Sequence, residues 1–339
     1  MNLMRKVLSA ILLLLMFCLY GCGKEQLPAP TDDTAQTGQT EATLAPLKTE
    51  GLTPAVPTET RIRFAAAGDN IAHDSVIATA AALAQDGKKY DFTAVYAGIA
   101  ELISSADLAF VNQEAPVGGE ELGISGYPNF NAPHEMVEGL IDAGFDIFNI
   151  ANNHMLDKGE SGLLATLDYW KNQPVTTIGA YRAESDFENV EILEKDGVRI
   201  ALLAFTYGTN GLKLPAGSET YIPYIDSELV ARKVAEAEEL ADLTIVSIHW
   251  GYENTFKPNE QQKEIAAVIH ENGGDVIIGH HPHCIQPIEW IGEGEDRTLC
   301  VYSLGNFMSE MAEDYNILGG MIAFDVTRLG ESGKASVEN

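Results

Sequence analysis

Basic residues are scarce in this chain of 339 residues: 21 Lys and Arg stand against 50 Asp and Glu, which gives a formal net charge of −29. Because proteins bind phosphate backbones through a basic face, this composition excludes nucleic acid as a bulk partner. Attachment to an anionic membrane or polymer by charge alone is disfavoured for the same reason. An anionic ligand would therefore need a local cation, such as a metal ion.

Cysteine is also scarce, with four residues, and only Cys284 and Cys300 lie in the part of the chain that we expect to fold. Two cysteines of an exported protein could form a disulfide. However, the segments that contain them resemble adjoining strands joined by a turn at 292–296. Counting outward from this turn places Cys300 opposite Glu289, so a disulfide is possible but not favoured.

A long hydrophobic run is missing, because the apolar run near the N-terminus covers only the 14 residues 7–20 and is short for a bilayer. It follows a basic start and precedes Gly21-Cys22, a pattern typical of a bacterial lipoprotein signal. We predict a signal peptide over 1–21 and a lipid on Cys22, which would anchor the protein to the extracytoplasmic face of the cell membrane. An ordinary secretory signal with an incidental cysteine is the alternative, and it also directs the protein out of the cytoplasm.

Residues 22–59 are rich in Thr, Pro, Ala and Gln and contain hardly any large apolar side chains. Such a segment cannot bury enough apolar surface to fold, so we predict a flexible tether behind the lipidated cysteine. The rest of the chain predicts one domain over 60–330, followed by a C-terminal tail over 331–339. We find no internal repeat and no coiled-coil heptad pattern.

Strand and helix patterns alternate along the predicted domain, which is typical of α/β proteins. A cluster of strand patterns near the C-terminus adds an antiparallel portion. The expected strands are 62–67, 108–111, 146–150, 175–178, 190–193, 199–205, 243–248, 275–278, 285–290, 298–302 and 320–326, of which 190–193 and 199–205 should pair. The expected helices are 75–84, 93–105, 134–143, 161–171, 226–240 and 260–272.

Polar residues follow five of these expected strands at the point where each strand ends. They are Asp69, Asn112, Glu114, Asn152, Asn153, His154, His249, His280, His281 and His283. In α/β sheets, ligands bind in the crevice beyond the carboxyl ends of the strands. Converging strand ends would bring carboxylates, amides and imidazoles together, and this is a set of metal ligands.

Most of these motifs have an ordinary structural explanation when each is taken alone. Gly68-Asp69 is often only a turn, and Glu114 could be a solvated loop carboxylate. His249 could be a core histidine, and Asn153-His154 could be a local turn. The exception is the segment 279–283, Gly-His-His-Pro-His, because three histidines in four residues are improbable as packing. This segment predicts a metal site without further support.

The motifs in their order along the chain resemble the CapA (also called PgsA) family of poly-γ-glutamate capsule proteins. They are Phe-Ala-Ala-Ala-Gly-Asp at 64–69, Asn-Gln-Glu at 112–114, Ala-Asn-Asn-His at 151–154, His-Trp-Gly at 249–251, Gly-His-His-Pro-His at 279–283 and Tyr-Ser-Leu-Gly-Asn-Phe at 302–307. That family is in turn similar to the calcineurin-like metallophosphoesterases. The resemblance covers about 62–326, and the segment Ser-Leu-Gly-Asn-Phe is its most distinctive part.

The resemblance implies a four-layer α/β/β/α sandwich of the metallophosphoesterase type with a centre of two divalent metal ions, Mn, Fe or Zn. The matching positions for metal ligands are Asp69, Glu114, Asn153, His249, His281 and His283. His154 matches the histidine that protonates the leaving group. His73, Asn112, His280 and Asn306 are expected behind or beside these ligands.

Two positions depart from the phosphoesterase pattern. The first motif there is Asp-x-His, whereas this chain has Ile71 at the place of that histidine, with His73 as a possible substitute. The second motif there contains a bridging aspartate, whereas this chain has Asn112-Gln113-Glu114. The CapA-like pattern shares both departures, which alter one metal pocket and the way two metals could be bridged.

Two hypotheses for function follow. The first is a lipid-anchored hydrolase of the phosphoesterase type, in which two cations polarise a phosphoryl or carbonyl oxygen and acidify bound water. The second is a non-catalytic, metal-stabilised accessory protein for assembly or export of a capsular polymer. The expected partners are an anionic envelope polymer or its precursor, the membrane, and other capsule-synthesis membrane proteins. The chain contains no Ser/His/Asp arrangement, P-loop or dinucleotide fingerprint.

Overall fold

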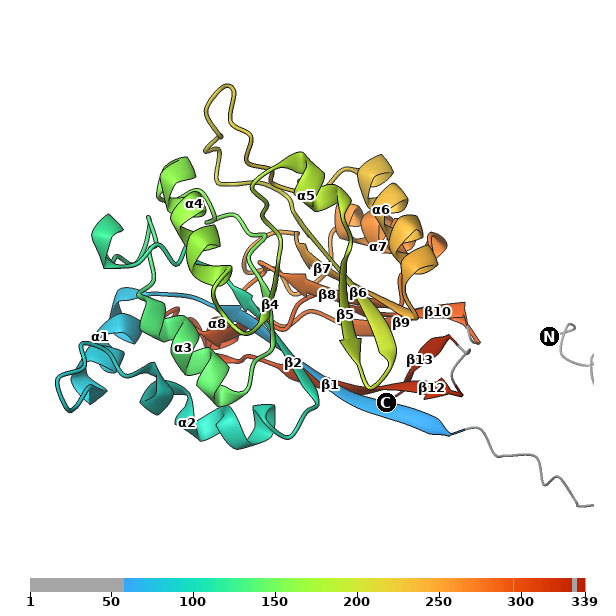
Figure 1. Cartoon of the computed structure of the whole chain (residues 1–339), viewed down its shortest axis with the longest axis horizontal. Coiled ribbons are helices and arrows are strands. Elements are labelled where there is room, and N and C mark those ends of the chain that lie inside the picture. The colour runs from blue at the N-terminus through green and yellow to red at the C-terminus, as the bar shows by residue number, and fades with distance from the viewer. Residues whose placement is uncertain (1–57, 295, 331–333, 339) are drawn as a thin grey trace, which may run out of the picture. The chain divides into compact units, whose positions relative to one another are not determined.

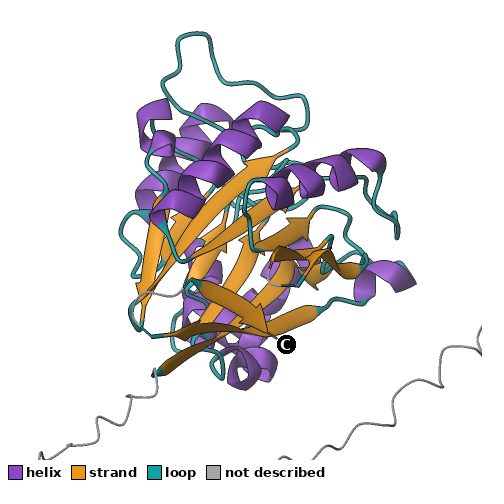
Figure 2. Ribbon diagram, turned by 90° about the vertical axis from the view of Figure 1, so that its right-hand side faces the viewer, coloured by secondary structure: helices purple, strands orange, loops and turns teal. Residues whose placement is uncertain are grey.

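The structure is a computed structural model that describes residues 58–294, 296–330 and 334–338. The predicted signal peptide, Cys22 and nearly all of the predicted tether lie outside these residues. In the described part, two β-sheets stack on one another, and helices cover the outer face of each sheet (Figures 1 and 2). The predicted α/β/β/α sandwich is therefore confirmed. Among the described helices, none has the length and apolar character needed to span a membrane.

The first sheet has seven strands, and most of them run parallel. They are β1 (Glu59–Asn70), β2 (Leu108–Gln113), β3 (Ile147–Asn149), β4 (Thr176–Ile178), β11 (Asn306–Met308), β12 (Met321–Leu329) and β13 (Ala335–Glu338). Their order is β13-β12-β1-β2-β3-β4, with β11 paired to the end of β1. The strand β13 pairs antiparallel with β12, so the sheet continues into 331–339, where the sequence predicts only a tail.

The second sheet has six strands in the order β5-β6-β7-β8-β10-β9. They are β5 (Glu191–Lys195), β6 (Val198–Thr206), β7 (Leu243–His249), β8 (Val276–His280), β9 (Ile288–Glu293) and β10 (Asp296–Val301). The predicted pair of β5 and β6 is present, and both edge strands are antiparallel to their neighbours. Cys300 lies opposite Glu289, as counting from the turn predicts, and Cys284 and Cys300 are both buried free thiols.

Eight α-helices complete the described part of the chain. They are α1 (Asp74–Leu83), α2 (Phe92–Ile103), α3 (His134–Ala143), α4 (Gly159–Trp170), α5 (Glu184–Glu188), α6 (Ser227–Leu240), α7 (Glu260–Glu271) and α8 (Asp314–Ile317). Side chains at the N-caps fix three of the longer helices, because Asp91, Asp226 and Asn259 accept hydrogen bonds from backbone N–H groups of the first turn. The six helices expected from sequence are all present, with ends shifted by at most two residues.

Three hydrophobic clusters fill the three interfaces between the four layers. The cluster between the sheets takes Ile62, Phe64 and Ala66 from β1 together with residues of β6, β7, β8 and β10. The cluster under α1 to α4 takes the alternate residue Ala67. A third cluster joins the second sheet to α5, α6 and α7. Because side chains alternate between the faces of a strand, one buried strand can serve two cores at once.

The strand pairing brings the polar motifs to one edge of the sandwich. Asp69 at the end of β1 is in register with Asn112 of β2, and His249 at the end of β7 is in register with His280 of β8. The segment before β11 packs against Gly68, where an added Cβ would lie 1.9 Å from the carbonyl oxygen of Gly305. The motif at 302–307 is thus pressed against the strand end that holds Asp69.

We predict that Gly68→Ala lowers the free energy of unfolding by about 1–3 kcal/mol, because its methyl group meets backbone atoms that cannot move aside. Gly98→Ala is the control, since the helical, exposed Gly98 has open space around it, and it should raise stability by about 0.5–1 kcal/mol. Denaturant unfolding measures both. An unchanged midpoint for Gly68→Ala would show that the two segments are not in close contact.

Candidate metal centre

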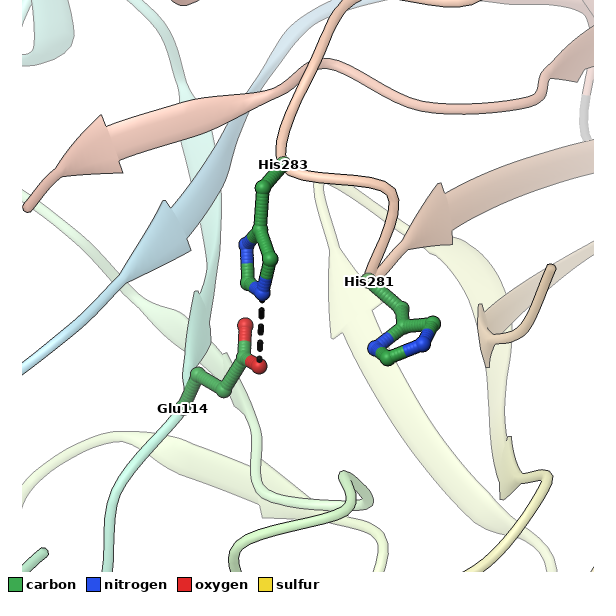
Figure 3. A group of neighbouring side chains, drawn as sticks. All are labelled: Glu114, His281 and His283. Carbon is green, nitrogen blue, oxygen red and sulfur yellow. Dashed lines mark ion pairs between the residues drawn. The ribbon is translucent and has the colours of Figure 1, made fainter. Parts of the chain in front are cut away.

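Five of the six predicted ligands form a buried cluster at this edge. Asp69, Glu114 and His249 bring ligand atoms within 4.8 Å of one another, and so do Glu114, His281 and His283. Figure 3 shows the second of these groups, with Glu114 facing His283 and His281 beside them. Glu114 belongs to both groups. The sixth residue, Asn153, contacts the cluster through its Oδ1, which accepts a hydrogen bond from His249 Nε2 at 3.1 Å.

The loop after β8 places two imidazoles through an unusual backbone. His281 and His283 have φ values of 96° and 53°, in the left-handed region that residues other than glycine rarely adopt. Asn316 Nδ2 donates to the carbonyl oxygen of His283 at 2.8 Å, and the backbone N–H of Asn254 donates to that of Pro282 at 2.9 Å. Strained backbone of this kind persists where surrounding contacts hold it and is common at functional sites.

Asp69 is a fully buried carboxylate that is surrounded by donors. Asn112 Nδ2 donates to its Oδ1 at 2.8 Å, and Nδ1 of both His280 and His283 lies 3.3 Å from its oxygens. Burial acts to raise the pKa of Asp69, but its hydrogen bonds with the two histidines outweigh burial and hold the pKa well below its usual value. Asp69 is therefore ionised at neutral pH.

Glu114 and His283 lie next to each other, and the charge of each changes the pKa of the other. Burial and then the nearby charge of Asp69 raise the pKa of Glu114 well above its usual value. Burial lowers the pKa of His283, but the two carboxylates outweigh it and raise this pKa to about 10. His283 Nε2 lies 3.6 Å from Glu114 Oε1 (Figure 3). The pair thus retains a proton at neutral pH.

His249 and His281 are neutral imidazoles. Burial lowers the pKa of His249 well below 6.5, and neighbouring histidines lower it further. Burial, followed by the charge of His283, lowers the pKa of His281 to about 3. Neutral imidazole is the form that binds metal ions, because the ring nitrogen then offers a lone pair.

The cluster contains polar atoms that nothing else in the described chain satisfies. Glu114 Oε1, His249 Nδ1 and His281 Nδ1 are buried and have no hydrogen-bond partner among the described residues. A buried polar atom without a partner costs about 1–3 kcal/mol. Carboxylate oxygens together with imidazole nitrogens suit divalent ions such as Mn, Fe or Zn. The residues therefore fit a divalent metal centre, and Glu114 is the residue common to both ligand groups.

Asn112, His280 and Asn306, three of the four residues expected behind or beside the ligands, lie next to them. His283 Nδ1 donates to Asn306 Oδ1 at 2.9 Å, which leaves Nε2 facing Glu114. The amide of Asn112 donates to Asp69 while its oxygen accepts from Asn149 at 2.8 Å. His280 stacks on Phe110, with ring centroids 5.7 Å apart. Partners of this kind fix the orientation of metal ligands.

A pocket of about 350 Å³ opens beside the cluster, and both Glu114 and His283 line it. His154 is on its wall, outside both metal-ligand groups. The ring of His154 packs edge-on against Phe130 at 4.6 Å, and its Nδ1 lies 2.8 Å from Asp157 Oδ2. This carboxylate fixes the ring and leaves Nε2 for the pocket. Asp157 is not among the residues predicted from sequence, although an acidic residue three positions after a candidate catalytic histidine was a usable signal.

His73 also lines the pocket but belongs to neither metal-ligand group. Its Nδ1 accepts a hydrogen bond from the backbone N–H of Glu310 at 3.3 Å, and burial lowers its pKa. The idea that His73 replaces the histidine missing at Ile71 is therefore not supported, because its ring is held by a different segment. Ile71 itself contributes an apolar wall.

The family described as "Bacterial capsule synthesis protein PGA_cap" matches residues 63–311. The capsule biosynthesis protein CapA of Bacillus anthracis is 33% identical over 184 residues, which are 53% of this chain and 44% of that protein. The PGA biosynthesis protein CapA of Bacillus subtilis (strain 168) is 36% identical over 176 residues, which are 51% of this chain and 45% of that protein. The match thus spans less than half the length of either relative.

Solved structures with a similar course of the chain include a putative 5'-nucleotidase from Staphylococcus aureus, at 15% identity and a TM-score of 0.49 over 83% of this chain and 53% of that one. The calcineurin-like phosphoesterase YfkN from Bacillus subtilis has 12% identity and a TM-score of 0.41, over 83% of this chain and 91% of that one. Values this low assign neither substrate nor mechanism to the present chain.

We predict that metal binding releases a proton, because His283, with a pKa of about 10, holds one at neutral pH and must lose it to bind a metal. Below pH 10 the apparent affinity should therefore rise with pH by about tenfold per unit for one proton. Calorimetric titration with Mn²⁺ in two buffers of different ionisation enthalpy measures the release. Equal heats in both buffers, with binding intact, would contradict this protonation state.

Proposed function

The chain belongs to the bacterial capsule synthesis protein family, as its motifs predict, and we propose that it is a metal-dependent phosphoester hydrolase acting in the biosynthesis of a capsular polymer. One observation supports the hydrolase most directly. A buried set of carboxylates and neutral imidazoles with unsatisfied ligand atoms lies against a pocket, and His154, held by Asp157, lies on the wall of the same pocket. A purely structural metal site would need neither the pocket nor this histidine.

The ligands we propose for two divalent ions are those predicted from sequence: Asp69, Glu114, Asn153, His249, His281 and His283. When bound, such ions polarise a phosphoryl oxygen and lower the pKa of water. The chain itself supplies the fixed geometry, because the ligands are buried and are held by Asn112, Asn306 and Asn316. A preorganised site of this kind spends little energy on reorganisation during the reaction.

His154 acts on the leaving group. The oxygen of a water molecule forms a bond to phosphorus and loses one proton to solvent, and the ester P–O bond breaks. The departing oxygen takes a proton from His154 Nε2, which then regains a proton from solvent, so the products are phosphate and an alcohol. Asp157 holds Nδ1 of the same ring at 2.8 Å and so sets the direction of Nε2. General acid catalysis of this kind contributes about 10²–10⁴-fold to the rate.

We also propose that the protein acts outside the cytoplasm, anchored by a lipid on Cys22, where it meets a capsular polymer or its lipid-linked precursor together with membrane proteins of capsule synthesis. The signal-like sequence at 1–21 supports this location, and the names of the two CapA relatives support the capsular role. A tether over 22–59 would hold the domain away from the bilayer.

A non-catalytic accessory role is the second candidate, and the departures from the phosphoesterase pattern favour it. Ile71 stands at the place of one histidine ligand, and Glu114 stands at that of a bridging aspartate. In this case the metal would stabilise the edge of the sandwich, and His154 would be dispensable.

The decisive experiment measures hydrolysis of p-nitrophenyl phosphate and bis-p-nitrophenyl phosphate by the full chain loaded with Mn²⁺, Fe²⁺ or Zn²⁺. We expect His154→Ala to lower kcat by about 10²–10⁴-fold at unchanged metal content, since it lies outside the ligand groups. Asp157→Asn should lower kcat by a smaller factor, because the ring remains but is less well held.

His134→Ala is the matched control, because this imidazole stacks on Tyr169 away from the pocket, and it should leave kcat unchanged. Metal-loaded protein that hydrolyses neither ester would favour the accessory role. Hydrolysis that does not change in His154→Ala would refute the role we give to this residue.

A further inference from the structure

The pocket beside the metal centre has an acidic outer wall. Glu253 and Glu310 line it, whereas no Lys or Arg occurs among its described lining residues. The inner end of the pocket also contains a ligand atom that has no hydrogen-bond partner among the described residues. Glu114 lines the same pocket, is fully buried, and has an Oε1 without a hydrogen-bond partner in the described chain. The end of the pocket at Glu114 is therefore suited to bound cations, and the carboxylates at its mouth are negatively charged.

Glu253 lines the same pocket as the buried ligands Glu114 and His283. It lies on the loop that follows β7 and is exposed. Its negative charge therefore acts on a molecule placed between the buried ligands and the mouth of the pocket.

Glu310 is held in place before any ligand arrives. Its Oε2 accepts a hydrogen bond from the backbone N–H of Ser75 at 2.9 Å, at the start of α1. Its own backbone N–H donates to His73 Nδ1 at 3.3 Å. The segment 73–75 at the start of α1 thus holds both the carboxylate and the backbone of Glu310 beside the pocket, so little entropy is lost when the carboxylate pairs with a ligand.

Aromatic side chains also line the mouth of the pocket. Tyr127 is 71% exposed, a large value for such a ring, and it lines the pocket next to Phe130 with ring centroids 6.2 Å apart. The faces of aromatic rings attract cations, and aromatic rings combined with carboxylates are the usual means of binding ammonium groups. Anionic groups gain nothing from such a wall.

From this arrangement we propose that the substrate is a phosphoester whose alcohol portion carries an ammonium group. The phosphate lies against the metal ligands, and the ammonium group lies among Glu253, Glu310 and the ring of Tyr127. This inference rests on the proposed hydrolase function. The products are inorganic phosphate, when the substrate is a monoester, and an amino alcohol that receives its hydroxyl proton from His154.

A competing explanation is that the two outer carboxylates only balance the charge of the bound cations. In that case they would not distinguish between substrates, and removing one would change the hydrolysis of all phosphoesters by the same factor. The proposal instead requires that the effect depend on the charge of the alcohol portion. The two explanations therefore predict different ratios of kcat/KM between a substrate with a positively charged alcohol portion and one with an uncharged alcohol portion.

The test compares phosphocholine with 3,3-dimethylbutyl phosphate, which has the same shape but no positive charge, on the full chain loaded with Mn²⁺. We expect kcat/KM to be higher for phosphocholine by about tenfold or more at low ionic strength, and we expect this ratio to fall as salt is added. In Glu253→Gln the ratio should fall by about fivefold, because one of two carboxylates is lost.

Glu313→Gln is the matched control. Glu313 is exposed on the same segment as Glu310 but does not line the pocket, so removing its charge should leave the ratio unchanged. A ratio near one in the wild-type protein would overturn the proposal. So would a Glu253→Gln variant in which both substrates change by the same factor.

These outcomes are distinguishable from failure of the hydrolase function itself. Hydrolysis of p-nitrophenyl phosphate with a ratio near one would leave the function intact and refute the inference. If no phosphoester is hydrolysed, calorimetric binding of the two compounds to Mn²⁺-loaded protein decides the inference. Tighter binding of phosphocholine that weakens in Glu253→Gln would support it, and equal affinities would overturn it.

Discussion

Two carboxylates, Asp69 and Glu114, are removed completely from water within one cluster, in a chain with a formal net charge of −29. Taking a carboxylate out of water costs several kcal/mol unless positive charge compensates it. Hydrogen bonds with histidines suffice for Asp69, whereas Glu114 keeps an oxygen without a hydrogen-bond partner. The positive charge of protonated His283 compensates part of the charge of Glu114, and bound divalent cations would compensate the rest. The side chains at this edge of the sandwich are arranged so that the negative charge of these two buried carboxylates can be compensated.

The two sheets and the segment 303–316 together position the side chains of the cluster. The first sheet supplies Asp69 and Glu114, and the second supplies His249, His281 and His283, so the cluster exists only when the two sheets are stacked. The segment 303–316 then closes the edge, since Asn306 holds His283 Nδ1 and Asn316 holds the carbonyl oxygen of His283. Folding and construction of the site are therefore coupled, because the hydrophobic cluster between the sheets fixes the distance between their ligands.

Most of the fold and the composition of the cluster could be predicted from the sequence. Buried parallel strands have nearly continuous apolar patterns, and their ends reveal where polar motifs gather. The strand β11 escaped prediction because it is short and depends on β1, a partner far along the chain. The strand β13 escaped it because its four residues form a strand only by pairing with the edge of β12. Asn316 and Glu253 were missed for a related reason: their importance comes from what they contact, and no local pattern encodes that contact. Spacing along the chain also does not reveal that the backbone of Glu310 bonds to the ring of His73 at the pocket.

The central claim is that the buried cluster holds two divalent ions in contact with Glu114. Anomalous diffraction from crystals of the protein loaded with Mn²⁺ tests it directly, because such data locate the ions independently of any enzymatic activity. The account predicts two anomalous peaks about 3.5–4 Å apart, one on each side of the Glu114 carboxylate. One should lie among Asp69 and His249, and the other should lie among His281 and His283. Data without a peak at this cluster, or with a peak only elsewhere, would contradict the account.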